Sequence, residues 1–95
     1  MLTFHAVTRK KLGTQASRRL RLQKQYPAII YGKNILPISI SLNYNHYFNI
    51  QQIKKIYKEK MILIINQKNE TMVKIQEVTY HPFKPIIMHI DFIRI

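Results

Sequence analysis

The sequence is short of three things: cysteine, long apolar runs and acidic residues. The lack of cysteine excludes disulfides, thiolate chemistry and Cys-based zinc or iron–sulfur sites, and it fits a reducing compartment. The longest apolar runs, such as residues 61–65, are far shorter than the ~20 residues that span a bilayer. Arg9, Lys10 and Lys11 follow the apolar start of the chain, which reverses the order found in a signal peptide. We therefore expect neither a membrane anchor nor a secretion signal.

The few acids are also unevenly placed. Sixteen Lys and Arg stand against four acids, which gives a formal net charge of +12 and a pI near 10.3. All four acids follow residue 33, whereas all arginines except Arg94 lie at or before Arg21. A compact chain this basic repels itself unless a polyanion neutralises it, so nucleic acid is the leading partner class and an anionic membrane surface the second. Because the guanidinium fork suits phosphates and guanine edges, the first third of the chain is the predicted contact surface.

The length predicts a single domain over residues 1–95. Apolar alternation predicts strands over residues 2–8, 28–31, 36–42, 61–65, 70–80 and 86–95, and helical spacing predicts helices over 15–25 and 45–57. The alternation slips near Glu77, as a β-bulge would cause. Six strands in so short a chain are most easily accommodated by a closed or nearly closed β-barrel, which leaves no free sheet edge. The expected fold is mostly β, with two short α-helices covering the openings of the barrel.

Turns and loops are predicted between these strands, around Lys33 and Asn34, at residues 66–69, and at residues 81–85, where two prolines stand close together. In the last strand, alternation divides the side chains between two faces. One face is expected to carry Ile87, His89, Asp91 and Ile93, and the other Met88, Ile90, Phe92 and Arg94.

Arginines gather on the first predicted helix. At helical spacing Ser17, Arg18 and Arg21 share a face, and Arg19 points elsewhere. Such a face can grip phosphates or enter a groove, or it can simply be solvated. Regular A-form RNA has a deep, narrow major groove that a helix cannot enter. The arginines therefore indicate duplex DNA, or RNA distorted by non-standard pairs or bulges.

Two further groups of side chains are candidates. Tyr31 ends a strand beside the basic region and is placed to stack on a base, whereas most other aromatics are expected to fill core edges. His89 and Asp91, two apart on a strand, point the same way. They could form a catalytic base with its orienter, a metal ligand pair, a structural pair, or a polar pair that reads RNA. An acid on an RNA-binding face is best placed where it accepts a hydrogen bond from a base amino group, since phosphate would repel it.

Two separated motifs resemble a known family. Gly13, Ala-Ser-Arg-Arg-Leu-Arg at residues 16–21 and Pro-Ala-Ile-Ile-Tyr-Gly at 27–32 resemble the N-terminal signature of the bacterial large-subunit ribosomal protein that binds 5S rRNA, the twenty-fifth of that subunit. His-Pro-Phe-Lys-Pro at 81–85 and His-Ile-Asp-Phe-Ile-Arg at 89–94 resemble its C-terminal signature. The resemblance spans Phe4 to Arg94 and matches the short, single-domain form.

The resemblance implies a β-barrel that docks on the loop E region of 5S rRNA, in the large subunit of the cytoplasmic ribosome. It implies no catalysis, cofactor, metal, membrane or small-molecule substrate, and it implies other large-subunit components as neighbours. The RNA-binding residues that it implies are Arg9, Ser17, Arg18, Arg19, Arg21, Tyr31, Gln76, His89 and Asp91. Thr14, Gln15 and Thr79 depart from the family pattern, and residues 43–60 fit it loosely.

Three functional hypotheses follow. The first is a structural RNA-binding protein of the large ribosomal subunit. The second is a general RNA-binding or stress-associated protein that acts outside the ribosome. The third is a small nuclease that uses His89 and Asp91.

Overall fold

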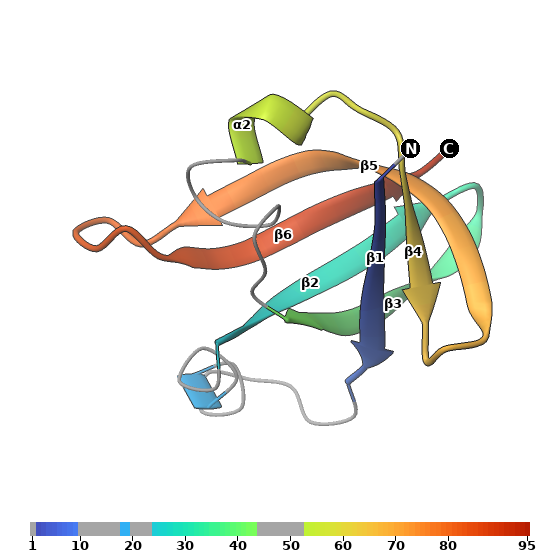
Figure 1. Ribbon diagram of the computed structural model, residues 1–95, viewed down its shortest axis with the longest axis horizontal. Coiled ribbons are helices and arrows are strands. Elements are labelled where there is room, and N and C mark those ends of the chain that lie inside the picture. The colour runs from blue at the N-terminus through green and yellow to red at the C-terminus, as the bar shows by residue number, and fades with distance from the viewer. Residues whose placement is uncertain (1, 10–17, 20–23, 44–52) are drawn as a thin grey trace.

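The chain folds into a closed six-stranded β-barrel, as the alternation predicted (Figure 1). The computed structural model describes residues 2–9, 18–19, 24–43 and 53–95. The elements are β1 (Leu2–Thr8), β2 (Gln25–Gly32), β3 (Ile35–Asn43), α2 (Ile53–Ile56), β4 (Met61–Ile65), β5 (Asn69–Tyr80) and β6 (Ile87–Arg94). Around the barrel the strands follow the order β1-β3-β2-β6-β5-β4, and β4 closes on β1.

The closing pair β1–β4 and the central pair β2–β6 are parallel, and the other neighbours are antiparallel. Asn66, in the turn after β4, ties that turn to the end of β1. Its side chain accepts a hydrogen bond from the Thr8 backbone N–H at 3.0 Å and donates one to the Thr8 hydroxyl at 3.1 Å. Its own N–H donates to the Ala6 carbonyl at 2.9 Å. Side-chain hydrogen bonds therefore hold the barrel closed where the parallel strands β1 and β4 end.

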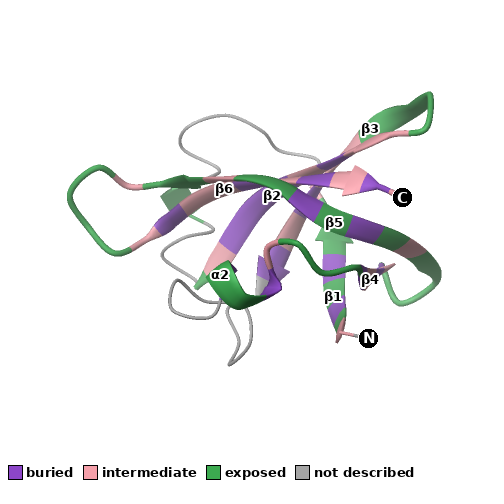
Figure 2. Cartoon of the chain, turned by 90° about the horizontal axis from the view of Figure 1, so that it is seen from above, coloured by how far each residue is buried: buried purple, intermediate pink, exposed green. Residues whose placement is uncertain are grey.

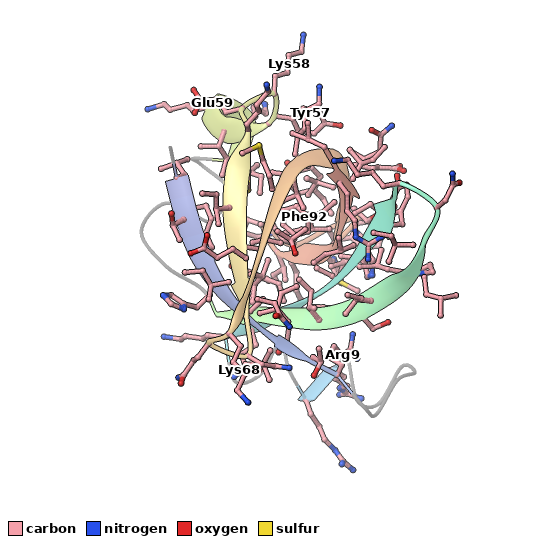
Figure 3. The ribbon with its side chains drawn as sticks, turned by 90° about the vertical axis from the view of Figure 1, so that its right-hand side faces the viewer. Arg9, Tyr57, Lys58, Glu59, Lys68 and Phe92 are labelled. Carbon is pink, nitrogen blue, oxygen red and sulfur yellow. The ribbon has the colours of Figure 1, made fainter. Side chains whose placement is uncertain are left out.

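The core lies inside the barrel and follows the period-2 pattern of the strands (Figure 2). Phe4 and Ala6 of β1 point inward, while Thr3 and His5 are exposed. Phe92 is fully buried and lies in the centre of the barrel (Figure 3). The short helix α2 contributes two buried side chains to the same cluster, Ile53 and Ile56. This helix therefore packs on the barrel core, as expected of a helix that covers an opening.

The predicted strand bounds are close to those observed, and the helices account for most of the differences. Residues 18–19 are helical, but Lys24 lies in a turn with φ 58° and Gln25 already belongs to β2. The predicted helix 15–25 therefore extended too far, because the left-handed backbone at Lys24 does not fit an α-helix. Of the predicted helix 45–57, the structure describes α2 and a turn at Tyr57, and the remainder lies outside the described residues. In the part of the chain that the structure describes, no helix is long and apolar enough to cross a membrane.

Two irregularities in the β5–β6 ladder set which side chains face outward. The register shifts between Ile75 and Glu77, so the bulge predicted near Glu77 is confirmed. It shifts again where Thr79 pairs with His89 and Tyr80 pairs with Ile87. This second irregularity corrects one prediction: Ile87 is buried with the core instead of sharing the outer face with His89. Simple alternation fails there because an extra residue in one strand reverses the side-chain phase.

The β2–β3 hairpin is built around Gly32 and Arg94. Gly32 has φ +111°, and a Cβ at this position would meet Ile93 Cγ1 at 3.2 Å and the Arg94 backbone nitrogen at 3.3 Å. Lys33 and Asn34, at the predicted turn, both have φ 57°, as a type I′ hairpin requires. Arg94 is 9% exposed and lies on the inner face with Ile90 and Phe92, as predicted. Its guanidinium donates to three backbone carbonyls of this hairpin, those of Gly32, Ile35 and Leu36.

Candidate RNA interface

The candidate residues His89 and Asp91 lie on the outer face of β6. Its neighbours β2 and β5 continue this face on either side. Ile29 of β2 pairs with Asp91 of β6, and Asp91 pairs on its other side with Glu77 of β5. Ser39 of β3 pairs with Ile29 and extends the row by one strand. Directly paired residues point to the same side of a sheet. We call Ser39, Ile29, Asp91 and Glu77 the cross-strand row.

His89 and Asp91 form a hydrogen-bonded pair on this face. His89 Nδ1 lies 2.9 Å from Asp91 Oδ1, and the two side chains are 39% and 33% exposed. The contact fixes the orientation of both groups, and it leaves the second carboxylate oxygen and the imidazole Nε2 for a ligand. Thr79, where the sequence departs from the family pattern, is the direct cross-strand neighbour of His89. A longer polar side chain at that position would lie beside the pair.

Tyr31 lies on the same face, two residues beyond Ile29 in β2. Partial burial raises the pKa of its hydroxyl, and the carboxylates of Asp91 and Glu77 raise it further. The phenol therefore stays protonated to higher pH than usual and remains a hydrogen-bond donor. The structure thus brings three predicted residues together, Tyr31, His89 and Asp91, on adjacent parallel strands.

Gln76 joins this group through the bulge in β5. Gln76 and Glu77 are consecutive and both exposed, because the extra residue at the bulge interrupts the alternation. The Gln76 carbonyl accepts a hydrogen bond from the Tyr57 hydroxyl at 2.9 Å, so the residue after α2 supports the bulge. The Gln76 backbone is thereby held in position, and its side chain lies in solvent next to the cross-strand row.

Arg9 lies at the far end of this row. Its backbone N–H donates to the Ser39 carbonyl at 2.9 Å, which continues the β1–β3 register by one residue beyond Thr8. With strands about 4.8 Å apart, Arg9 and Asp91 are then separated by three strand spacings, roughly 14 Å along the sheet. Arg9 is half-buried and lies at the end of the barrel opposite Tyr57 (Figure 3).

Arg18 and Arg19 are helical and exposed. They lie at the side of the barrel where β2 and β6 begin, in both views of the chain (Figures 1 and 2). The two other members predicted for this helix, Ser17 and Arg21, lie outside the described residues. Exposure of two adjacent arginines agrees with a role in contacting a ligand, and neither of them fills the core.

Sequence reasoning missed Glu77 as a candidate, and it set Arg94 apart from the other arginines without finding its structural role. Glu77 was recognised only as the point where the alternation slips, yet it faces Asp91 directly. Like charges opposed across two strands are unfavourable in water, so a ligand that donates to both carboxylates would relieve this repulsion. Arg94 is a structural residue that donates to the carbonyls of the β2–β3 hairpin.

Comparison with known proteins identifies the family. The model of the "Ribosomal L25p family" matches residues 4–92. The chain belongs to the ribosomal L25p family. It is 46% identical over 94 residues to the large ribosomal subunit protein bL25 of Erwinia tasmaniensis, and the match covers 99% of each chain. It is 47% identical over 96 residues to the bL25 protein of Buchnera aphidicola subsp. Baizongia pistaciae, covering 100% of this chain and 98% of that one. The resemblance carried by the two sequence motifs is thereby confirmed.

Membership of the ribosomal L25p family decides between the interpretations of His89 and Asp91. The family consists of ribosomal proteins and not of enzymes, so the nuclease hypothesis is dropped. Within the described ranges, no group of three or more His, Asp or Glu side chains is arranged to hold a metal ion. Of the interpretations of the pair, a structural role and an RNA-reading role are the two that fit a family of ribosomal proteins.

Proposed function

We propose that this protein is a structural component of the large ribosomal subunit, in the cytoplasmic ribosome, and that it binds 5S rRNA at the loop E region. The role in the large ribosomal subunit rests on the family and on relatives that are named as large ribosomal subunit proteins. The binding of 5S rRNA at loop E rests on the sequence motifs and on the side chains of the outer face. The other proposed neighbours are further components of the same subunit.

The observation that carries the proposal is the pair of carboxylates on a protein of net charge +12. Asp91 and Glu77 are two of only four acids, and they face each other beside His89 and Tyr31. Phosphates would be repelled there, whereas base amino groups donate hydrogen bonds to carboxylates. In RNA such groups and 2′-hydroxyls are accessible in the wide minor groove. The outer face of β2, β5 and β6 is therefore suited to base edges and riboses.

The arginines are suited to contact the phosphates of the RNA. Arg18 and Arg19 are exposed at the side where β2 and β6 begin, and Arg9 lies at the end of the cross-strand row. Ser17 and Arg21 are proposed to act with them on the sequence motif alone. Cations around a polar, partly acidic face favour an RNA whose groove is open and whose bases depart from regular pairing. This arrangement would give affinity through counterion release and selectivity through the acids.

The test is a binding titration with two RNAs of equal length, a 5S rRNA loop E fragment and a regular duplex. We expect a clear preference for loop E. Asp91→Ala should reduce this preference and Arg18→Ala should weaken binding, whereas Lys58→Ala, an exposed lysine beyond α2, serves as the matched control. Equal affinity of the unmodified protein for both RNAs would refute specific recognition. Cosedimentation with large subunits on a sucrose gradient separates the ribosomal role from RNA binding outside the ribosome.

A further inference from the structure

The loop between β5 and β6 carries an aromatic side chain that the fold does not use. Phe83 is 90% exposed, which is the largest exposure among the large hydrophobic side chains in the described ranges. Its ring packs edge-on against the ring of His81, with the ring centroids 6.3 Å apart and the planes at 63°. A single exposed hydrophobic residue is ordinary, but this one belongs to the loop of residues 81–86, which protrudes from the barrel (Figure 1).

Hydrogen bonds and two prolines restrain the backbone of this loop. The His81 N–H donates to the Ile86 carbonyl at 2.9 Å, and the Ile86 N–H donates to the Lys84 carbonyl at 2.8 Å. The His81 Nδ1 accepts two backbone N–H groups, from Phe83 at 3.0 Å and from Lys84 at 3.1 Å. Two prolines in the loop fix their own φ angles. Little backbone entropy is left to lose when Phe83 binds something, and such preorganisation favours affinity.

We propose that Phe83 stacks on an unpaired nucleobase of the bound RNA, and that Lys84 contacts a phosphate next to that base. The inference rests on the proposed RNA-binding function and extends it beyond the strand face. Flat rings stack on any base, because every base has a π-face. Residues 81–86 contain no acid, and the whole chain is strongly basic. This charge favours an anionic partner over an apolar pocket on another basic protein.

The position of the loop argues for a base outside the helix that the strands contact. Asp91 and Ile87 are four residues apart on β6, which is about 13 Å, and Phe83 lies in the loop beyond Ile87. The loop connects the two strands that carry His89, Asp91 and Glu77. An RNA held on that face would therefore extend toward the loop. A base within reach of Phe83 would lie at the margin of the held segment, where unpaired bases are available for stacking.

The experiment compares affinities for isolated 5S rRNA and a regular duplex at several salt concentrations. Phe83→Ala should weaken 5S rRNA binding roughly fivefold to 100-fold while leaving the salt dependence unchanged. Phe83→Leu keeps an apolar side chain without a π-face and should lose most of the same affinity. Lys84→Ala should reduce the salt slope by about one, whereas the exposed turn residue Lys68→Ala should not. Binding should also shift the ring-proton resonances of Phe83 upfield, as stacking on a base requires.

His81 is a positioning residue, because it holds the backbone that carries Phe83. Variants of His81 test whether RNA binding needs this backbone geometry as well as the phenylalanine ring. His81→Ala removes the acceptor for the two backbone N–H groups and should reproduce part of the Phe83 loss. His81→Asn places an amide oxygen where Nδ1 stands, as in an Asx-turn, and should restore binding. The variants of Phe83 and Lys84 change only exposed side chains, and they should not alter the thermal unfolding midpoint by more than a degree or two.

The outcomes distinguish this inference from the proposed function. If the unmodified protein prefers 5S rRNA and Phe83→Ala binds it equally well, the stacking proposal is wrong. If Phe83→Ala binds RNA normally but no longer cosediments with large subunits, Phe83 contacts another component of the subunit, and the proposal is again overturned. If the unmodified protein binds both RNAs equally and Phe83→Ala loses affinity for 5S rRNA alone, the stacking proposal holds and the proposed loop E specificity is refuted. If Phe83→Ala loses affinity for the regular duplex to the same extent, stacking on an unpaired base is refuted. No RNA binding at all would refute both.

Discussion

Arg94 offers the sharpest test of the division between the structural arginine and the arginines proposed to bind RNA. Its guanidinium donates to the carbonyls of Gly32 at 2.9 Å, Ile35 at 3.2 Å and Leu36 at 2.9 Å, and the residue is 9% exposed. Hydrogen bonds that involve a charged group contribute about 1.5–3 kcal/mol each. Arg94→Met removes all three bonds and keeps most of the apolar stem, so it leaves no large cavity.

The expected cost is less than the sum of the three bonds. Ile35 and Leu36 are exposed, so their carbonyls can turn to water once the arginine is gone, and only the bond to Gly32 should be lost without compensation. We expect Arg94→Met to lower the free energy of unfolding by about 3 kcal/mol, the upper value for one such bond. For a domain of this size, that corresponds to a fall of roughly 12–24 °C in Tm.

The assay is urea unfolding followed by far-UV circular dichroism, with the free energy extrapolated linearly to water. Arg94→Lys keeps the charge without the planar fork and should fall between Arg94→Met and the unmodified protein. Arg18→Met, at an exposed arginine, should change stability by less than about 0.5 kcal/mol. A stability of Arg94→Met within 0.5 kcal/mol of the unmodified protein would refute the reasoning. So would a loss of RNA affinity equal to that of Arg18→Ala in the folded state.

Three further predictions concern the hairpins and the outer face. Gly32→Ala should lower the free energy of unfolding by about 1–3 kcal/mol, because its φ is +111° and its Cβ would press on the β6 backbone; thermal melts measure this. Asn66→Ala breaks both side-chain bonds to Thr8 and should cost about 1–3 kcal/mol in the same assay, with Gln67→Ala as the exposed control. Asp91→Asn should bring the raised pKa of Tyr31 only part of the way back toward 10.0, because burial remains; NMR titration of the ring carbons checks this, and an unchanged pKa would contradict it. Since the folded-state pKa lies above the unfolded one, the neutral phenol stabilises the fold below pH ~10, and this contribution is lost as the pH rises further.

The fold was largely predictable because strand alternation is a local signal. The bounds predicted for β1 and β4, residues 2–8 and 61–65, are those observed. The start of β2 was missed because it depends on the backbone of Lys24, and nothing in the sequence marks a lysine with positive φ. The inward turn of Ile87 was missed for a related reason, since a second irregularity in the β5–β6 ladder changes the phase and no Gly or Pro marks it.

The candidate site was predictable residue by residue but not as an arrangement. His89 and Asp91 could be placed together because they are two apart on one strand, and the structure confirms their contact. Their proximity to Tyr31 and Glu77 depends on which strands are neighbours and in which register, and these are long-range properties of the closed barrel. Contacts of this kind cannot be read from local periodicity.

The barrel would give the proposed discrimination between RNAs a rigid basis. Flexible basic segments bind any polyanion, because phosphate contacts carry no sequence information. Discrimination requires groups whose contact with the wrong partner raises the free energy of binding. A carboxylate does this whenever it meets a phosphate. Here the backbone of Asp91 is held between β2 and β5 by ladders on both sides, and the contact with His89 at 2.9 Å favours one orientation of its carboxylate. The acids would therefore act mainly by penalising regular duplexes, and Asp91→Ala should raise affinity for the regular duplex as well as lower it for loop E.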